Sequence, residues 1–281
     1  MIAKEINQLA EDTLRFSVCT LVTDLAEYQT MLNSFLRAGF KDEFCEFIYV
    51  DNSQMNKYDA YAGLNKMIRA ASGKYIILCH QDVELNFDNL EVLEERIKEV
   101  NVLDQDWAVL SNAGGLRLKK RVEHIQYPDQ KEMNVGPFPF QVKSVDENFI
   151  LIKKEANLSF SHNLKGFHLY GTDLCIIASV LGYNAWVIDF LLLHKSRGNV
   201  DESFYKSKEE LLLKYRKAYR SRYIRSMCTT VYISGQRILG LTMNTRIVIF
   251  LCKLGNKLRR ALNPAYFYLL SGVICPALFY L

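Results

Sequence analysis

The N-terminal part of the chain alternates short apolar runs with longer stretches in which apolar residues recur at helical spacing. The runs FSVCTLV at 16–22, EFIYV at 46–50 and YIIL at 75–78 are rich in β-branched and aromatic residues, which predicts strands buried on both faces of a parallel sheet. Between these runs, the helical spacing falls on Tyr28, Met31, Leu32, Phe35 and Leu36, and then on Tyr61, Leu64, Met67, Ile68 and Ala71. Alternating strands and helices with short joints predict a right-handed parallel α/β unit.

The pattern continues less regularly toward residue 205. We expect a charged helix over 88–100, strands over 107–110, 144–153 and 183–190, and an apolar helix that begins near Thr172. The segment 111–136 is polar and contains Gly114 and Gly115, so it is either a mobile functional loop or a solvated insertion. The predicted fold class is α/β, with a mainly parallel central sheet flanked by helices.

Charge divides the chain into two parts. Residues 1–205 contain 21 Lys and Arg against 29 Asp and Glu, whereas residues 206–281 contain 14 against 2. A chain of 281 residues can bury one sizeable core and still carry an appendage. We therefore expect a ligand-binding domain over 1–205 and a basic, helical region over 206–281 that has an anionic partner.

Cysteine usage and the N-terminal sequence indicate the compartment. The seven cysteines are scattered without a CxxC pair, which favours free thiols in a reducing compartment over disulfides or a zinc site. The start, MIAKEINQLAED, is polar and mixed in charge, so we expect no secretory signal. Both features place the protein on the cytoplasmic side.

Polar residues directly follow the apolar run at 75–78. His80, Gln81 and Asp82 are expected at the carboxyl end of this strand, where open α/β sheets bind ligands. A carboxylate at that place can hold a divalent cation that bridges the phosphates of a nucleotide. Asp51 and Asn52 follow the preceding strand in the same way. An ordinary polar loop or turn is the alternative for both groups.

Taken together, residues 16–198 resemble the nucleotide-sugar-dependent glycosyltransferases of the A-type fold, in particular the inverting, family 2-like enzymes. The resemblance rests on four landmarks in order: VDNS at 50–53, NKMIRAASGKYIILCHQDV at 65–83, GTDL at 171–174 and the region around His194. It implies that residues 1–205 form a catalytic domain that binds a nucleoside diphosphate sugar, most often a UDP-sugar. The sugar would be transferred to a hydroxyl group of a glycan or lipid-linked acceptor.

The resemblance also implies a divalent metal ion, Mn²⁺ or Mg²⁺, at the leaving diphosphate. Asp82 matches the last position of the family's Asp-x-Asp metal motif, whereas His80 replaces the first aspartate. Imidazole can ligate Mn²⁺, although oxygen ligands suit both ions better, so His80 is either a ligand or a hydrogen-bond donor to one. His194 matches the histidine that some members use as a third ligand, with a structural histidine as the alternative.

The resemblance assigns further residues to nucleotide-sugar binding. They lie near the ends of the first three strands, in the helix before the third strand, and in the loop HKSRG at 194–198. They are Thr20, Val22, Asp24, Asp51, Asn52, Asn65, Gln81, Lys195 and Arg197.

Asp173 is the implied general base, which removes the proton of the attacking acceptor hydroxyl. The family usually has two acidic residues at this place, whereas this chain has Thr172 and Asp173. A plain helix cap is the alternative for Asp173. Asp146, His168 and Tyr170 are candidates for contact with the acceptor or the donor.

The C-terminal region combines positive charge with apolar surface. From Lys214 to Arg260 there are twelve basic residues and no acidic one, and the segment 265–281 is uncharged. Its 17 residues include a proline, which suits an interfacial or re-entrant anchor better than a membrane span. We expect peripheral attachment to the anionic inner face of the cell membrane. Homo-oligomerisation through a helical packing element is the alternative, and we expect no nucleic-acid partner because no binding motif is present.

The sequence therefore predicts a metal-assisted, inverting glycosyltransferase that acts in surface polysaccharide or glycolipid synthesis. The missing first aspartate motivates an alternative, a catalytically silent nucleotide-sugar-binding scaffold at the membrane. A nucleotidyltransferase is disfavoured, because TLVTDLAE at 20–27 is not a glycine-rich, basic phosphate loop.

Overall fold

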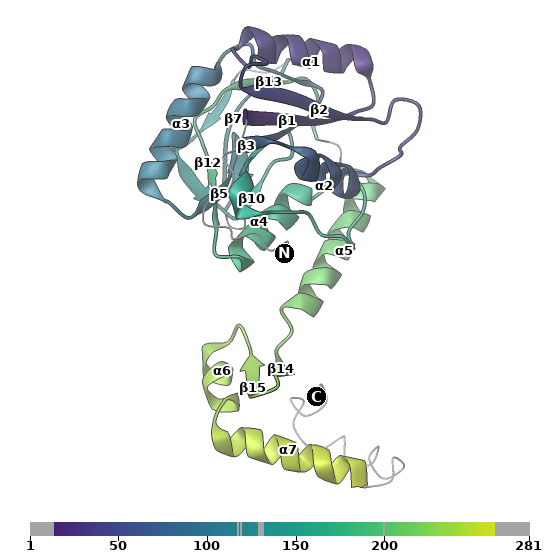
Figure 1. Ribbon diagram of the computed structural model, residues 1–281, viewed down its shortest axis with the longest axis vertical. Helices are drawn as coiled ribbons and strands as arrows, with labels where there is room; N and C mark the ends of the chain where they lie inside the picture. Colours follow the sequence, from purple (N-terminus) through teal and green to yellow (C-terminus); the bar gives the residue numbers. More distant parts are fainter. Residues whose placement is uncertain (1–13, 117, 119, 129–131, 199, 262–281) are drawn as a thin grey trace, which may run out of the picture. The chain divides into compact units, whose positions relative to one another are not determined.

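The computed structural model describes residues 14–261, apart from residues 117, 119, 129–131 and 199. The chain divides into two compact units, one up to Leu211 and one from Leu212 (Figure 1). The boundary expected between residues 205 and 206 falls inside helix α5, Glu202–Ala218. The last acidic residues of the chain, Glu209 and Glu210, also lie within this helix.

A mixed seven-stranded sheet forms the centre of the first unit, with the strand order β2-β1-β3-β11-β5-β12-β9. Five strands share one direction: β1 (Leu14–Val22), β2 (Cys45–Asp51), β3 (Gly73–Cys79), β5 (Trp107–Ser111) and β12 (Asn184–Val187). Two run against them: β9 (Phe140–Val142) and β11 (Phe149–Lys153). The expected fold class, α/β with a mainly parallel sheet, is confirmed.

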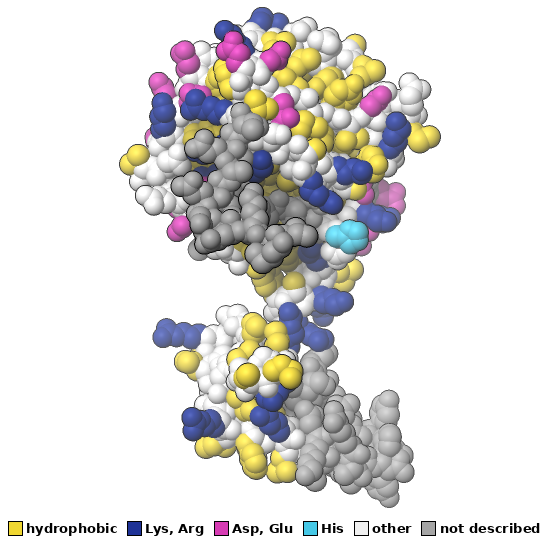
Figure 2. Space-filling model, in the orientation of Figure 1, with side chains coloured by type: hydrophobic (Ala, Val, Ile, Leu, Met, Phe, Trp, Pro, Cys, Tyr) yellow, Lys and Arg dark blue, Asp and Glu magenta, His cyan; other side chains and the backbone are white. Residues whose placement is uncertain are grey.

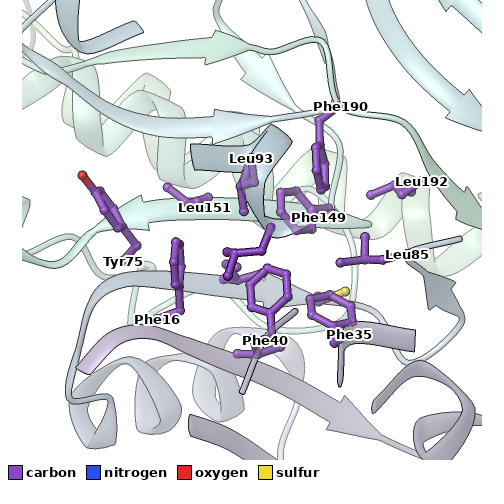
Figure 3. Packing of buried hydrophobic residues seen from close by; sticks show 14 of the residues in the cluster. Phe16, Phe35, Phe40, Tyr75, Leu85, Leu93, Phe149, Leu151, Phe190 and Leu192 are labelled. Carbon is purple, nitrogen blue, oxygen red and sulfur yellow. The ribbon is translucent and has the colours of Figure 1, made fainter. Parts of the chain in front are cut away.

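Helices cover both faces of this sheet (Figure 1). α1 (Leu25–Arg37) and α3 (Leu90–Leu103) lie on one face, and α2 (Ala60–Ala70) and α4 (Tyr170–Val180) lie on the other. Figure 3 shows the core under the first pair, where Phe16 of β1, Phe35 of α1 and Leu93 of α3 are fully buried. Each fully buried large apolar side chain contributes about 1.5–3 kcal/mol, so this face anchors the strand ends that carry the site.

The register of the strands brings several chain segments to one edge of the sheet. In the parallel pairs, Val22 is opposite Asp51 and Cys19 is opposite Leu78, so β1, β2 and β3 end at the same edge. β11 begins there as well, because this antiparallel strand pairs Phe149 with Cys79. The turn before β11 therefore lies beside the polar residues that follow β3.

A second sheet continues the fold at this edge, with the strand order β10-β6-β7-β13-β4 and β8 beside β7. Its strands are β4 (Val83–Glu84), β6 (Ala113–Gly115), β7 (Arg121–Gln126), β8 (Met133–Val135), β10 (Ser144–Val145) and β13 (Leu192–His194). The segment 111–136, expected to be irregular, thus contains three short strands that satisfy its backbone groups by pairing.

The single strand expected over 144–153 is also corrected by the structure. It consists of two strands, β10 and β11, which belong to different sheets. Asp146, Glu147 and Asn148 connect the two strands. A short 3₁₀ helix, η1 (Lys154–Ala156), follows β11 directly. Asp146 and Glu147 therefore stand in a turn at the carboxyl edge of β3, not at the start of a strand.

The second unit is small and basic. β14 (Arg222–Arg225) and β15 (Thr230–Ile233) form a hairpin that is followed by α6 (Arg237–Met243) and α7 (Arg246–Ala261). None of residues 212–255 is buried, and Figure 2 shows basic side chains beside apolar ones on the visible face of this unit. Exposed apolar surface of this kind commonly marks an interaction site.

No single helix among the described residues is long and apolar enough to cross a membrane. α6 together with α7 up to Gly255 meets the requirements of length and composition, but the two parts are bent by 72° at the break between them. The uncharged segment 265–281, expected to be an interfacial anchor, lies outside the described residues.

Candidate functional site

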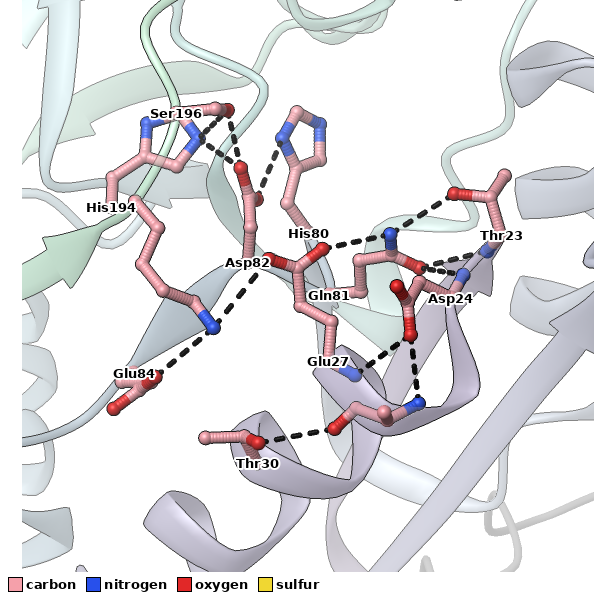
Figure 4. A network of polar contacts seen from close by, with 12 residues as sticks. Thr23, Asp24, Glu27, Thr30, His80, Gln81, Asp82, Glu84, His194 and Ser196 are labelled. Atoms are coloured by element: carbon pink, nitrogen blue, oxygen red, sulfur yellow. Dashed lines mark hydrogen bonds and ion pairs between the residues drawn. The ribbon is translucent and has the colours of Figure 1, made fainter.

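His80, Asp82 and His194 meet at the carboxyl end of β3. His80 and Asp82 follow this strand directly, and the pairing of β13 with β4 places His194 opposite Val83, next to Asp82. Asp82 Oδ2 lies 3.4 Å from His194 Nε2, and Asp82 Oδ1 lies 3.8 Å from His80 Nδ1 (Figure 4). One potential ligand atom from each residue lies within 4.8 Å of the other two. The fold therefore brings together the three predicted metal ligands.

The spacing and chemistry of this cluster fit a divalent metal ion. Metal–nitrogen and metal–oxygen bonds of about 2.0–2.2 Å place the ligand atoms of one ion roughly 3–4 Å apart. Two imidazole nitrogens and one carboxylate suit Mn²⁺, Fe²⁺ or Zn²⁺ better than Mg²⁺. A three-residue set also leaves coordination positions for ligand oxygens.

The protonation states of Asp82 and His80 favour the binding of a cation at the cluster. Burial opposes ionisation of Asp82, but hydrogen bonds and charge from His194, Ser196 and His80 outweigh burial and hold the pKa of Asp82 well below its usual range. The Ser196 hydroxyl donates to Asp82 Oδ2. Burial lowers the pKa of His80, although Asp82 acts in the opposite direction. An ionised carboxylate beside a neutral imidazole is the form in which these groups bind metal.

A cavity of about 240 Å³ opens beside the cluster. His80 and Asp82 line it together with residues from the ends of β1 and β2, from α2 and from the start of α4. Its apolar surface comes from residues such as Leu21, Leu64 and Phe167. A concave site that combines apolar surface with a few convergent polar groups is typical of small-molecule binding.

Gln81 braces the loop that follows β1 (Figure 4). Its Oε1 accepts hydrogen bonds from the backbone N–H groups of Thr23, at 2.7 Å, and Asp24, at 3.1 Å. Its Nε2 donates to Thr23 Oγ1 and Glu27 Oε2, both at 3.0 Å. These four bonds use the full capacity of the amide, so Gln81 shapes the wall of the cavity. Asp24 is exposed, and its Oδ1 caps α1.

Lys195 and Arg197 follow His194 in the loop after β13. Lys195 Nζ lies 3.1 Å from Glu84 Oε1 and 3.5 Å from Glu27 Oε1. Burial alone would lower the pKa of Lys195, but these two carboxylates outweigh it and raise the pKa. Lys195 is thus paired with two carboxylates, and its diphosphate contact stays a prediction. Arg197 is exposed, and its diphosphate contact stays a prediction.

The side chains of Thr20, Val22 and Asn65 are buried, and their role in nucleotide-sugar binding stays a prediction. Thr20 and Val22 are fully buried in the core, where the Thr20 hydroxyl lies 3.6 Å from Met31 Sδ. Asn65 exchanges two hydrogen bonds with the backbone of Phe160, at 2.9 and 2.8 Å. Alternate residues of a strand point to opposite faces of the sheet, so nearness to the edge in sequence does not expose a side chain.

Asn52 and Asp51 remain at the carboxyl edge of β2. Asn52 lines the 240 Å³ cavity, but its amide bonds the backbone of Tyr58 and closes the intervening loop. Asp51 Oδ1 accepts a hydrogen bond of 2.8 Å from the Ser53 N–H group, and hydrogen bonds from Ser53 lower the pKa of Asp51. The role of Asp51 in nucleoside recognition stays a prediction.

A second cavity, of about 310 Å³, lies beside the turn between β10 and β11. Asp146 and Glu147 line it, as do Tyr127 and Thr172. The Tyr127 ring lies 6.0 Å from the His194 ring, so this cavity adjoins the metal-ligand cluster. Asp146 is exposed, as suits its predicted contact role. Glu147 was not among the predicted site residues, because the apolar pattern over 144–153 predicted one continuous strand there.

Tyr170 connects the first cavity to the turn that borders the second. Its side chain is buried, and its hydroxyl lies 2.7 Å from His80 Nε2 and donates to the backbone oxygen of Glu147 at 3.3 Å. Tyr170 lines the first cavity and is linked to the turn that borders the second. His168 instead lies against α5, where its Nε2 is 3.0 Å from Ser203 Oγ.

Asp173 lines neither of these cavities. It is fully buried in the first turn of α4, and its two carboxylate oxygens accept hydrogen bonds from the Ser161 N–H group, at 2.8 Å, and the Ser161 hydroxyl, at 2.6 Å. A general base must be reachable by the hydroxyl that it deprotonates. Its buried position disfavours Asp173 as the base, and that role stays a prediction. α4 begins at Tyr170, which places Asp173 inside the helix instead of at its exposed start.

Comparison with known proteins adds one relative and two solved structures of similar fold. No family model matches the chain. The chain is 35% identical over 234 residues to "ATP synthase subunits region ORF 6" from Fuscovulum blasticum, covering 80% of this chain and 93% of the relative.

Both solved structures have a sequence identity of 13%. One is TarS 1–349 from S. aureus in complex with UDP-GlcNAc, with a TM-score of 0.49 and coverage of 72% of this chain and 67% of that one. The other is the mannosyltransferase PcManGT from Pyrobaculum calidifontis in complex with GDP-Man and Mn²⁺, with a TM-score of 0.48 and coverage of 76% and 67%. At these scores, neither structure decides the function of this chain.

Proposed function

We propose that this chain, which belongs to the same family as ATP synthase subunits region ORF 6 of Fuscovulum blasticum, is a metal-assisted glycosyltransferase. Its donor is a nucleoside diphosphate sugar, with a UDP-sugar as the first candidate. Its acceptor is a hydroxyl group of a glycan or a lipid-linked sugar. The proposal combines the chemistry of the site with the family resemblance of residues 16–198.

The observation that carries the proposal is the cluster of His80, Asp82 and His194 beside the 240 Å³ cavity, which His80 and Asp82 line. A divalent cation held there would neutralise the charge that develops on a leaving diphosphate. Asp82 is the central ligand, because it lies near both histidines. Ser196 orients Asp82 by donating a hydrogen bond to Oδ2, the supporting role that outer residues play at metal sites.

The placement of the two cavities supports an inverting reaction. The 240 Å³ cavity is bordered by the ends of β1 and β3 and suits the nucleotide, whereas the 310 Å³ cavity adjoins the same cluster through Tyr127. An acceptor hydroxyl that attacks from the second cavity while the diphosphate leaves toward the first inverts the anomeric configuration. Tyr170 lines the first cavity and keeps His80 in place through its hydroxyl.

The second unit suggests where the acceptor is found. It has many basic residues and no acidic one from Lys214 to Arg260, and large apolar side chains such as Ile238, Ile247 and Phe250 are exposed. Basic charge beside exposed apolar surface favours an anionic membrane surface. We therefore place the protein on the inner face of the cell membrane, in surface polysaccharide or glycolipid synthesis.

Donor turnover tests the proposal. The purified full chain is incubated with UDP-glucose, UDP-N-acetylglucosamine or GDP-mannose and Mn²⁺, and the released nucleoside diphosphate is measured. We expect release from one donor, a strong reduction by a chelator, and loss of release in Asp82→Asn. Nucleotide binding without release from any donor would instead favour a silent nucleotide-sugar-binding scaffold. A wild-type chain that neither binds nor turns over these compounds would refute both functions.

A further inference from the structure

We propose that Glu147 is the general base of the transfer and that the adjoining 310 Å³ cavity receives the acceptor hydroxyl group. This inference rests on the proposed function. It gives the role of the base to a carboxyl group that lines a cavity, whereas Asp173 is fully buried against Ser161. Glu147 suits the role through its position, its link to the metal-ligand cluster and the environment of its carboxyl group.

Glu147 lies at the point where the proposed donor and acceptor sides meet. It stands in the turn before β11, and β11 begins opposite the last residue of β3 because Phe149 pairs with Cys79. Its neighbour Asn148 accepts a backbone hydrogen bond of 3.0 Å from His80. The Tyr170 hydroxyl also connects the backbone oxygen of Glu147 to His80 Nε2. Two separate contacts thus fix the turn against the metal-ligand cluster.

A hydrogen bond holds the carboxyl group of Glu147 in place, and the group remains open to the cavity. Its Oε1 accepts a hydrogen bond of 3.1 Å from the Gly171 N–H group at the start of α4. The residue is half-buried and lines the cavity, so a hydroxyl group in the cavity can approach it. Asp173, two residues beyond Gly171, has both oxygens occupied and no exposure. Of these two carboxylates near the start of α4, only Glu147 is accessible.

The surroundings of Glu147 also give it suitable basicity. Burial and the neighbouring Asp146 raise its pKa to about 8, against the opposing effect of backbone hydrogen bonds from Gly171 and Leu169. A general base is most effective when its pKa lies near the working pH. Charged and titratable groups from several elements face this carboxyl group or share its cavity. They are Asp146 in the same turn, Tyr170 and Cys175 of α4, Tyr61 of α2, Arg121 and Glu123 of β7, and Tyr127.

The proposed step is balanced within the donor, the acceptor and this side chain. The acceptor O–H bond breaks and its proton moves to the Glu147 carboxylate. The acceptor oxygen forms a bond to the anomeric carbon, and the bond from that carbon to the diphosphate oxygen breaks. The nucleoside diphosphate leaves with the electron pair. When no sugar acceptor is present, water takes the place of the acceptor and the donor is hydrolysed.

The test compares Glu147→Gln with Glu155→Gln in the full chain. Glutamine retains an oxygen that can accept from Gly171 but cannot take the proton. Glu155 is exposed just after β11, at its far end, so its substitution is a matched control outside the site. Nucleoside diphosphate release is measured from pH 6 to 9 with the donor that the wild type uses, and calorimetric binding of the same nucleotide confirms that each variant is folded.

We expect Glu147→Gln to bind nucleotide like the wild type but to release product about 10²–10⁴ times more slowly, with Glu155→Gln unchanged. The wild-type rate should rise with pH and level off near pH 8, the pKa of Glu147. This rise should be absent in Glu147→Gln and partly restored in Glu147→Asp. A merely structural role would leave the shape of the pH profile unchanged.

Two results separate this inference from the proposed function. A wild-type chain without any donor turnover would refute the proposed function itself. An active wild type with an equally active Glu147→Gln, or with a pH profile that the substitution leaves unchanged, would overturn the assignment of Glu147 alone. A larger loss of rate in a folded Asp173→Asn than in Glu147→Gln would overturn it as well.

Discussion

Replacing Asp173 by asparagine should destabilise the first unit, because the carboxylate of this residue is part of the buried framework. It has no exposure, and it accepts one hydrogen bond from the Ser161 N–H group and one from the Ser161 hydroxyl. A hydrogen bond to a charged group contributes about 1.5–3 kcal/mol. Asparagine keeps an acceptor for the N–H group and can donate to the hydroxyl oxygen, so we expect a loss of about 1–2 kcal/mol for Asp173→Asn. Asp173→Ala leaves a buried donor unpaired, and we expect a loss of about 3–4 kcal/mol.

Urea unfolding, followed by tryptophan fluorescence, measures the loss of stability in the first unit. The chain has two tryptophans, Trp107 and Trp186, and both lie in strands of the first unit. A double-mutant cycle with Ser161→Ala isolates the direct interaction, and we expect a coupling free energy above about 1 kcal/mol. Unchanged stability of Asp173→Asn together with a loss of donor turnover of about 100-fold or more would refute this reasoning and restore Asp173 as the base.

Three further predictions follow from the site and the second unit. Ser196→Ala removes the hydroxyl that donates to Asp82, so the apparent Mn²⁺ affinity, measured by metal-dependent nucleotide binding, should fall about 10–100-fold; an unchanged affinity would contradict a supporting role for Ser196. The pKa of Glu147 is raised from 4.5 to about 8 in the folded state, so the folded state binds this proton more tightly than the unfolded state. Glu147 therefore lowers the free energy of unfolding of the wild type as the pH rises from 4.5 to 8. Relative to the wild type, Glu147→Gln should therefore gain stability in urea unfolding as pH rises from 4.5 to 8, and a constant difference over this range would contradict the shift. The full chain should sediment with vesicles that contain about 30% anionic lipid and much less with neutral vesicles, and it should be released by high salt because the attraction is screened; equal binding to both kinds of vesicle would contradict an electrostatic contribution.

The sequence predicted the central sheet well because its strands are short, apolar on both faces and separated by amphipathic helices. The run at 75–78 became β3, and the polar residues after it lie at the carboxyl edge as expected. His194 is 112 positions after Asp82 in the chain, yet it could be placed through the family resemblance. The structure supplies the physical reason, which is the pairing of β13 with β4.

The sequence was less informative where the outcome depended on the direction of a side chain or on a break between strands. Apolar periodicity over 144–153 suggested one strand and concealed the turn that carries Glu147. A helix start predicted at Thr172 suggested an exposed Asp173, but α4 begins at Tyr170 and directs Asp173 toward Ser161. Single-residue differences of this kind depend on tertiary packing, which local patterns do not encode.

Ser196 was missed for a different reason. Serine in an exposed loop carries no distinctive sequence signal, and its importance appears only when β13 brings the loop beside Asp82. The same pairing brings Lys195 between Glu27 and Glu84. The candidate site thus depends on two features. The strand ends are indicated by the sequence, whereas the contacts between distant loops are apparent only in the folded structure.

The central claim is that Asp82 and its two histidines hold a metal ion that binds the diphosphate of a nucleotide. Calorimetric titration of the full chain with UDP and with GDP, each with and without Mn²⁺, tests this claim most directly. We predict tight binding of one nucleotide that requires Mn²⁺ and is lost in Asp82→Asn. Binding that is independent of both Mn²⁺ and Asp82, or no binding of either nucleotide, would contradict it.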